Sequence, residues 1–501
     1  MKFQFKKKLS LLFAVMALLV GTPASYSQES NRYESLKGSQ GTVVSEGGDV
    51  VITRAANIRG FGKDADPDIN SPKSATFSKD GSKFYINSLE GCKTVVYDAK
   101  TRQKLKVIEH KFDSGKGNLW LPMSGFYQFT HYPDGIEKAF GGKPVEAALS
   151  KDGRYLFVPY YRRTFDLNAQ DPSALAVIDT QKDEIVLMTE TGPLPKMVKV
   201  SNDGRLLAIT HWGDNTVGFL DISDSNPRNW KHLPPVEVGK KLNLNYSLTS
   251  PVNRDSGSGY LLRGTVFLPG DSLLLVSGMA GPLAVIDVKK REWIGMVPAM
   301  GNVRHITIKG DMLYLSRNSA GEVLTVPVKN VVDAVSSQRA TSREFKINGV
   351  KRARVGGGAR TLKVSPGGNY IFVASNTAKE IGIVRTSDMK KIVSIPADPF
   401  PVGLDISPDG LTVISTSQGR KGNGGGNAVN IFDLAYAVPE KAVAEPEDEA
   451  VVQPAADTLS AQEQWVKEQK ADRFWWIIGM VIGIVLFLAL AFYAWRRKKR
   501  E

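Results

Sequence analysis

The clearest pattern along the chain is a repeated order of apolar strands, tight turns and polar loops. One copy reads SATFSKDGSKFYINS from residue 74, and its next strand, TVVYD, ends at Asp98. Turns with Asp-Gly, Gly-Asp or Gly-Gly supply the positive φ angles that tight hairpins need. The flanking runs are rich in Val, Ile, Phe and Tyr, which favour strands. Each copy therefore predicts three antiparallel strands.

The phrase occurs seven times, and most copies are followed by a further apolar run. The other copies begin at residues 146, 197, 264, 305, 361 and 403. Runs such as KLKVIE, EIVLMTE, WIGMV and KIVSI follow the third strand and read as a fourth one. Four antiparallel strands repeated seven times predict an all-β fold, a seven-bladed β-propeller of the WD40-like kind.

The two ends of the repeat array complement each other. The seventh copy stops at Asp433 without a fourth strand, and an isolated strand pattern, DVVITR at 49–54, precedes the first copy. We expect strand 49–54 to complete the last blade, because ring closure hides the sheet edges that an open array exposes. Aspartates also recur where the third strand ends, and we expect them to cap the following turn. They are Asp98, Asp179, Asp221, Asp287 and Asp433.

Several phrases of the repeat resemble those of a known family. PVGLDISPDG, IFVASN and LAVIDT look like YVTN-type propeller repeats, which occur in surface-layer-like proteins, in lactonase-type propellers and in the propeller domain of haem-d nitrite reductase. The resemblance covers roughly residues 49–436 and implies the fold. It implies little about function, since one fold carries many activities.

Both ends of the chain carry apolar segments. Residues 1–27 read as a signal peptide, with a basic start, an apolar run too short to span a bilayer and small residues before the cleavage point. Residues 474–495 are free of formal charge and long enough for a transmembrane helix. The basic tail 496–501 is then cytoplasmic by the positive-inside rule. We therefore expect a single-pass membrane protein with its propeller in the periplasm or at the cell exterior. A processed C-terminal sorting signal is the alternative.

Between propeller and predicted helix lies an acidic, Ala- and Pro-rich segment at 437–473, which reads as a stalk. Residues 28–436, the predicted propeller domain, hold 52 basic and 41 acidic residues, a formal charge of +11 before histidines. On that side of a membrane, nucleic acid is not an expected partner. We expect an envelope protein, an anionic polymer or a small anion. The alternative is that the charge serves solubility.

The composition offers no cofactor or metal motif. Cys92 is the single cysteine, so no intramolecular disulfide can form, and there is no CxxCH for a c-type haem. The five histidines make no HxxxH or HExxH pair. We accordingly expect no metal and no cofactor.

Basic side chains recur near the start of the innermost strand when the copies are aligned on their turns. They are Lys73, Lys196, Arg263, Arg304 and Arg360. Because innermost strands ring the channel of a propeller, we expect a cationic collar at one channel mouth, where an anion could bind. The competing interpretation is that each cation caps carbonyls or pairs with a carboxylate of its own.

Candidate ligand-binding residues also lie in segments that interrupt the regular blades, at 111–142, 159–173 and 223–260. These segments supply Trp120, Tyr127, Tyr132, Arg162 and Arg163. Aromatic and arginine side chains on loops suit a sugar, peptide or protein surface. The alternative is that they only pack the insertions down. His211, Trp212 and His305 are further candidates, each a ligand, a general base or a structural side chain.

Taken together, the residues favour a binding or scaffold module of the bacterial cell envelope. The motifs contain no nucleophile–base pair, so no catalytic residue is assigned and an enzyme is the less favoured class. Two alternatives stay open: a lactonase-like hydrolase on the same fold, and a propeller partner of a periplasmic redox enzyme.

Overall fold

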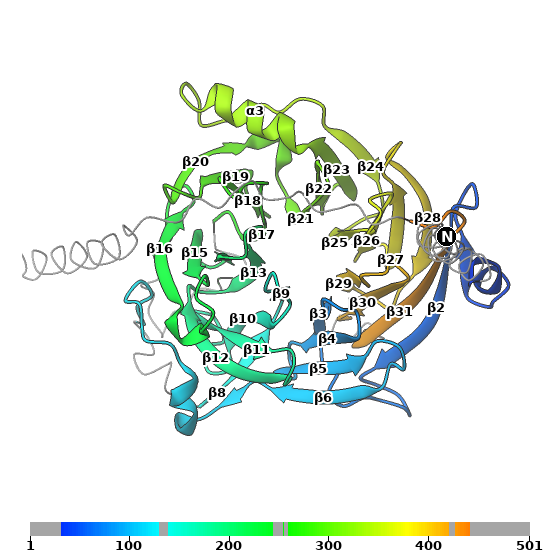
Figure 1. Ribbon diagram of the computed structural model, residues 1–501, viewed down its shortest axis with the longest axis horizontal. Coiled ribbons are helices and arrows are strands. Elements are labelled where there is room, and N and C mark those ends of the chain that lie inside the picture. Colours follow the sequence, from blue (N-terminus) through cyan, green and yellow to red (C-terminus); the bar gives the residue numbers. More distant parts are fainter. Residues whose placement is uncertain (1–31, 130–138, 244–253, 255–258, 420–425, 441–501) are drawn as a thin grey trace, which may run out of the picture. The chain divides into compact units, whose positions relative to one another are not determined.

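Seven antiparallel sheets follow one another along the chain and make an all-β seven-bladed propeller (Figure 1). The computed structural model describes residues 32–129, 139–243, 254, 259–419 and 426–440. The described residues form two compact units. The first takes in the described parts of 32–109, 304–331 and 347–440, and the second takes in the described parts of 110–303 and 332–346.

Four blades belong to the first unit, and each repeats the strand pattern seen in the sequence. One blade is β3 Pro72–Phe77, β4 Lys83–Ser88, β5 Lys93–Asp98 and β6 Lys104–Glu109. Two more are β21 Val303–Lys309, β22 Met312–Arg317, β23 Glu322–Pro327 and β24 Lys351–Arg354, and β25 Ala359–Val364, β26 Tyr370–Ser375, β27 Glu380–Arg385 and β28 Lys390–Pro396. The fourth is β29 Pro401–Ile406, β30 Thr412–Ser417, β31 Ala428–Tyr436, β2 Val50–Arg59 and β1 Thr42–Val44.

The second unit holds the other three blades. The first of them is β7 Lys111–Phe112, β8 Phe140–Pro144, β9 Ala148–Leu149, β10 Tyr155–Arg163, β11 Ser173–Asp179 and β12 Glu184–Thr191. The next two are β13 Pro195–Val200, β14 Leu206–His211, β15 Thr216–Asp221 and β16 Lys231–Glu237, and β17 Leu262–Phe267, β18 Leu273–Gly278, β19 Leu283–Asp287 and β20 Glu292–Val297.

The predicted closing strand is confirmed. Strand β2 pairs antiparallel with β31, and Thr53 stands opposite Asp433. The strand is longer than the sequence pattern suggested, because a register shift between Arg54 and Ala56 lets the pairing continue to Arg59. A fifth strand, β1, then pairs with β2. Chain segments far apart in sequence are thereby hydrogen-bonded into one blade.

The turn chemistry is also confirmed at four of the five aspartates. Asp98 accepts backbone N–H bonds from Lys100 and Thr101 at 3.0 and 2.6 Å. Asp179, Asp221 and Asp287 likewise accept backbone N–H bonds from residues two or three further on. Asp433 differs, because its two oxygens accept from the Arg102 guanidinium at 3.0 Å each. This exception ties β31 to the turn between β5 and β6.

The predicted insertion at 223–260 contains a regular blade strand. Residues 231–237 form β16, the fourth strand of its sheet, with Phe219 opposite Leu233 and Val217 opposite Val236. Pro234 and Pro235 argue against a strand at this position in the sequence, because proline is rare in strands except at a sheet edge or a bulge. Strand β16 is such an edge, and its register shifts between these two pairs.

The repeat also conceals an α-helix. Helix α3, Val328–Gln338, follows β23 and precedes the outer strand β24. Its buried positions are Val328, Val331, Ala334 and Val335, the spacing of one helical face. The spacing of apolar residues in this copy therefore changes from a strand period to a helix period after β23.

Each unit has its own apolar core. In the first unit, Ile52, Phe372, Leu404 and Phe432 belong to one buried cluster. In the second, Phe157, Leu175, Leu207 and Trp230 belong to another. Successive side chains of a strand point to opposite faces of its sheet. Because neighbouring residues along the strands are buried, both faces of the sheets are covered. The sheets are thus rigid supports for the loops that join them.

The predictions for the chain ends concern residues outside the described ones. The signal peptide at 1–27, the transmembrane segment at 474–495 and the tail at 496–501 all lie there, as does the stalk beyond Glu440. Within the part of the chain that the structure describes, no helix is both long and apolar enough to span a bilayer.

Candidate functional site

A closed cluster of polar side chains lies inside the second unit, and it contains two sequence-predicted residues, Tyr127 and His211. The ring of Tyr127 meets those of His211 and His232 nearly at right angles, with centroids 5.5 and 5.6 Å apart. All three side chains are buried. His232, on β16, is not among the predicted site residues, because no local pattern places its strand beside Tyr127.

The hydrogen bonds of His211 define its proton position. The backbone N–H of Gly192 donates to His211 Nε2 at 3.1 Å, so the neutral ring carries its hydrogen on Nδ1. That hydrogen is donated to Thr216 Oγ1 at 2.8 Å, and the Thr216 hydroxyl donates to Asp214 Oδ1 at 2.7 Å. A short chain of hydrogen bonds therefore links the imidazole to a carboxylate inside the blade.

Burial governs the protonation of this cluster. It lowers the pKa of His211 to about 3, with Lys241 and His232 adding to the effect, and it lowers the pKa of His232 to about 4. Burial raises the pKa of Asp214 to about 6 despite the Thr216 bond, and it raises the pKa of Glu190. Both imidazoles are therefore neutral at physiological pH.

The cluster is enclosed rather than open to a substrate. His232 shares a 2.6 Å hydrogen bond with Thr189, and Glu190 accepts from the backbone and hydroxyl of Ser124. Tyr127 Oη, Glu190 Oε2 and His232 Nδ1 are buried atoms with no hydrogen-bond partner among the described residues. Such atoms suit internal water, which commonly satisfies buried polar groups.

Two separately predicted residues, Lys196 and Trp212, are brought together by β13 and the end of β14. Lys196 Nζ lies 4.4 Å from the Trp212 ring centroid and 3.5 Å from that of Tyr161. The predicted Arg162 stands over the same Tyr161 ring at 4.6 Å. Lys196 is buried, so its charge is held by aromatic faces within the fold.

Two predicted arginines of the second unit have structural surroundings. Arg163 is buried against the rings of Phe129, Phe140 and Phe165 and donates to the Pro172 carbonyl at 2.6 Å. Arg263 donates to Glu146 at 3.0 Å, and this ion pair is buried on both sides. Burial lowers the pKa of Arg263, and the charge of Glu146 opposes that shift.

Other predicted residues lie apart from these groups. Trp120 is half-buried beside Phe140, and Tyr132 falls outside the described residues. In the first unit, Lys73 donates to Gln418 at 3.4 Å, and the Arg360 guanidinium stands 5.5 Å from the Phe400 ring centroid. Arg304 and His305 are half-buried on β21. Since the five collar cations belong to different units, their convergence at one channel mouth stays a prediction.

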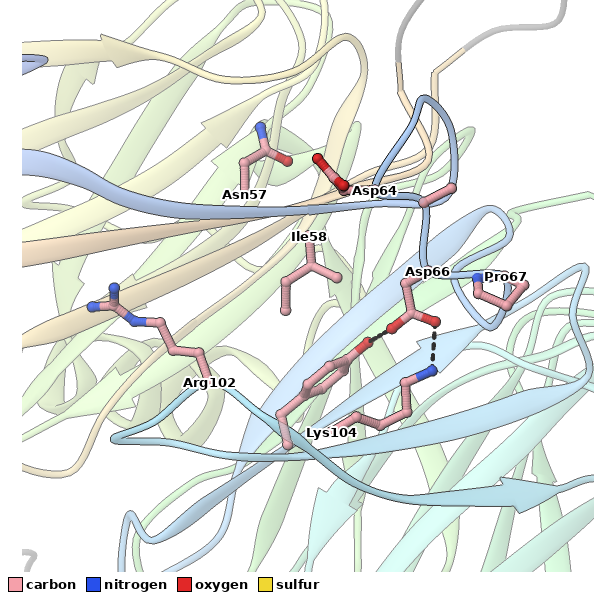
Figure 2. A pocket seen from close by; sticks show the side chains of 9 residues that line it. Asn57, Ile58, Asp64, Asp66, Pro67, Arg102 and Lys104 are labelled. Atoms are coloured by element: carbon pink, nitrogen blue, oxygen red, sulfur yellow. Dashed lines mark hydrogen bonds and ion pairs between the residues drawn. The ribbon is translucent and has the colours of Figure 1, made fainter.

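An open pocket lies on the first unit at a place that the sequence did not indicate (Figure 2). Its volume is ≈ 420 Å³. Nine residues line it, from β2, the loop after it, and the β5–β6 hairpin. They are Asn57, Ile58, Asp64, Ala65, Asp66, Pro67, Tyr97, Arg102 and Lys104.

Ion pairs fix one wall of this pocket. Asp66 accepts from the Tyr97 hydroxyl at 2.7 Å and from Lys104 Nζ at 2.6 Å. Burial and the bond to Asp66 raise the pKa of Tyr97. Lys104 also reaches Asp68 at 2.5 Å, so the lysine is shared by two carboxylates. The loop carrying Asp64, Asp66 and Asp68 is thereby fastened to the hairpin.

Comparisons with known proteins support no assignment beyond the fold. No protein-family model matches the chain, and no curated protein matches it. One similar solved structure is the hydrazine synthase of Kuenenia stuttgartiensis, at 14% identity and a TM-score of 0.49, covering 72% of this chain and 95% of that one. Another is the Cps50 (Swd1) β-propeller domain of Myceliophteria thermophila, at 13% identity and a TM-score of 0.49, covering 72% and 96%.

Proposed function

We propose that this chain is a binding or scaffold module of the bacterial cell envelope, anchored in the membrane by residues 474–495 and displaying its propeller outside the cytoplasm. One observation carries the binding role. The pocket on the first unit is open and carries charged and amide side chains, whereas the histidine-rich cluster of the second unit is buried. Rigid sheets that support an accessible polar pocket suit recognition.

A hydrolase is the weaker proposal for a chemical reason. General base catalysis needs an imidazole or carboxylate that reaches substrate with a pKa near the working pH. The imidazoles of His110, His211 and His232 are buried, and burial lowers their pKa values to about 3 or 4. Their hydrogen bonds go to Tyr160, to Gly192 and Thr216, and to Thr189, which suits structural histidines.

The proposed location and partners rest on the sequence. The signal peptide and the C-terminal apolar segment support export and anchoring, and the phrases PVGLDISPDG and LAVIDT support kinship with YVTN-type propellers. The positive charge of residues 28–436 supports an acidic envelope protein or anionic polymer as the partner. Nucleic acid is not proposed.

Two measurements test this function on the full chain. Protease added to spheroplasts should digest the propeller while a tag after residue 501 stays protected, and deletion of 474–501 should release the protein from the membrane. Cross-linking on intact cells, followed by purification of the full chain, should then recover a defined envelope partner. A propeller that is protected inside spheroplasts contradicts the proposal.

A further inference from the structure

The pocket on the first unit already holds a partner for each of its cations. Lys104 is bound by Asp66 and Asp68, and Arg102 by Asp433. Arg102 also donates to the Ala55 carbonyl through Nη1, and its Nε is a buried atom without a hydrogen-bond partner among the described residues. The positive charges of the pocket are therefore neutralised by the protein itself, and an anion gains little by binding there.

One acceptor of the pocket is left over, and its orientation is fixed. Asn57 Nδ2 donates to Asp398 Oδ2 at 2.5 Å. Because a carboxylate beside Arg54 and Arg59 accepts hydrogen bonds, the amide nitrogen must face Asp398 and the oxygen must face away. Asn57 Oδ1 is enclosed and has no hydrogen-bond partner among the described residues, a costly condition for a polar atom.

The one uncompensated charge of the pocket is Asp64. Its side chain is exposed, and no contact to its carboxylate is found among the described residues. In Figure 2 the side-chain oxygen of Asn57 lies next to the Asp64 carboxylate, above Ile58. Two acceptor groups that face each other repel unless a donor stands between them. Because Asp64 is exposed and unheld, it can rotate to admit that donor.

From this geometry we propose that the pocket binds a primary alkylammonium group between Asn57 and Asp64. The proposal rests on the binding function proposed above and names its ligand class. An ammonium carries three N–H donors, and Asn57 Oδ1 with the two Asp64 oxygens offers three acceptors. The alkyl stem would lie along the apolar side chains of Ile58, Ala65 and Pro67, which also line the pocket.

A metal ion suits these residues less well. Calcium takes six to eight oxygen ligands, more than Asn57 and Asp64 supply. Among the described residues, no group of three or more His, Cys, Asp or Glu side chains is arranged to hold a metal. The remaining question is the source of the amine, which is a free diamine or the lysine side chain of a partner protein.

Calorimetric titration of the full-length chain at low salt tests the proposal, with putrescine and Nα-acetyl-lysine methylamide as probes. Asp64→Asn keeps the size of the side chain and removes its charge, and we expect it to weaken binding at least about tenfold. Asp64→Lys should abolish it. Asp311→Asn, an exposed aspartate of the same unit, is the matched control and should bind like the wild type.

The acidic segment 437–473 attracts amines in every variant, so the difference between the wild type and Asp64→Asn is the result that counts. Weakening of either probe by Asp64→Asn supports the proposal, and the tighter probe identifies the source. Equal binding by wild type and Asp64→Asn overturns it. So does equal binding of neutral 1,4-butanediol, which would point to a polyol instead.

The amine-binding test and the tests of the proposed envelope function can fail independently of one another. If Asp64→Asn leaves amine binding unchanged while cross-linking still recovers an envelope partner, only the alkylammonium assignment is wrong. If the amines bind as expected while the propeller proves to be cytoplasmic, only the envelope role is wrong.

Discussion

The buried pair of Arg263 and Glu146 offers a direct test of whether the predicted collar cations bind ligand or support the fold. The pair joins β17 to the segment between β8 and β9, and its side chains are 3% and 8% exposed. We expect Glu146→Gln to destabilise the protein by roughly 3–5 kcal/mol, because it leaves a guanidinium buried without its carboxylate.

The magnitude follows from the geometry. Two unit charges 3.0 Å apart attract one another by about 5.5 kcal/mol at an effective dielectric constant of about 20. The cost of removing both from water offsets much of this gain, so the intact pair adds little net stability. Loss of one partner forfeits the attraction and keeps the desolvation cost of the other. The double substitution Glu146→Leu with Arg263→Met removes both charges and should recover most of the loss.

Urea unfolding followed by tryptophan fluorescence measures these changes, since Trp212 and Trp230 are buried in the same unit. Glu237→Gln, an exposed glutamate on β16, is the control and should change the unfolding free energy by less than about 0.5 kcal/mol. A loss below about 1 kcal/mol for Glu146→Gln would refute the structural reading of Arg263. A double variant, Glu146→Leu with Arg263→Met, that is no more stable than Glu146→Gln would also refute it.

Two further predictions follow from the buried side chains. The pKa values of His110, His211 and His232, lowered by burial to about 3 or 4, mean that the unfolded chain binds more protons, so stability should fall as pH decreases from about 6.5 toward 4. Asp214, whose pKa burial raises to about 6, opposes this fall between pH about 6 and 4, and Asp214→Asn should therefore steepen it by up to about 1.4 kcal/mol per pH unit. Urea midpoints from pH 7 to 4.5 measure the slope, and an unchanged slope contradicts the assignment. Ile52→Ala, at a fully buried position of the closing strand β2, should lower the free energy of unfolding by about 2–5 kcal/mol, whereas Val44→Ala, at an exposed position of β1, should change it little. Equal unfolding midpoints for the two variants would count against ring closure by β2.

The blades could be predicted from sequence because their signals are local. A hairpin needs only its own turn residues and the apolar runs that flank them, and those stand within about twenty residues of each other in every copy. The closing strand 49–54 could be predicted because the seventh copy lacks a fourth strand and an isolated strand pattern precedes the first copy. Strand β16 could not, since Pro234 and Pro235 remove the usual strand signal.

The pocket could not be predicted, because its walls meet only through the fold. Tyr97 and Asp66 are 31 residues apart, and Arg102 and Asp433 are 331 apart. The run of Asp64, Asp66 and Asp68 was visible in the sequence, but nothing local places it against the β5–β6 hairpin. His211 and Tyr127 are each candidates from the sequence. The chain of hydrogen bonds from His211 through Thr216 to Asp214 depends on the side-chain directions in a turn, which cannot be derived from the sequence.

The position of the pocket relative to the repeat also has a physical explanation. Within the regular part of a blade, strand side chains are committed to the core and turn side chains to capping, as at Asp98 and Asp179. Side chains become available for a ligand where the repeat is broken and the chain must be carried between two blades. The segment after β2 is such a place, because β2 belongs to the last blade while β3 opens the first. Its loop must cross between them. Asp64 is exposed on this loop, and Asn57 Oδ1, on the strand before it, has no hydrogen-bond partner among the described residues. The closing strand and its connection to the first blade are therefore the places where this propeller offers side chains to a ligand.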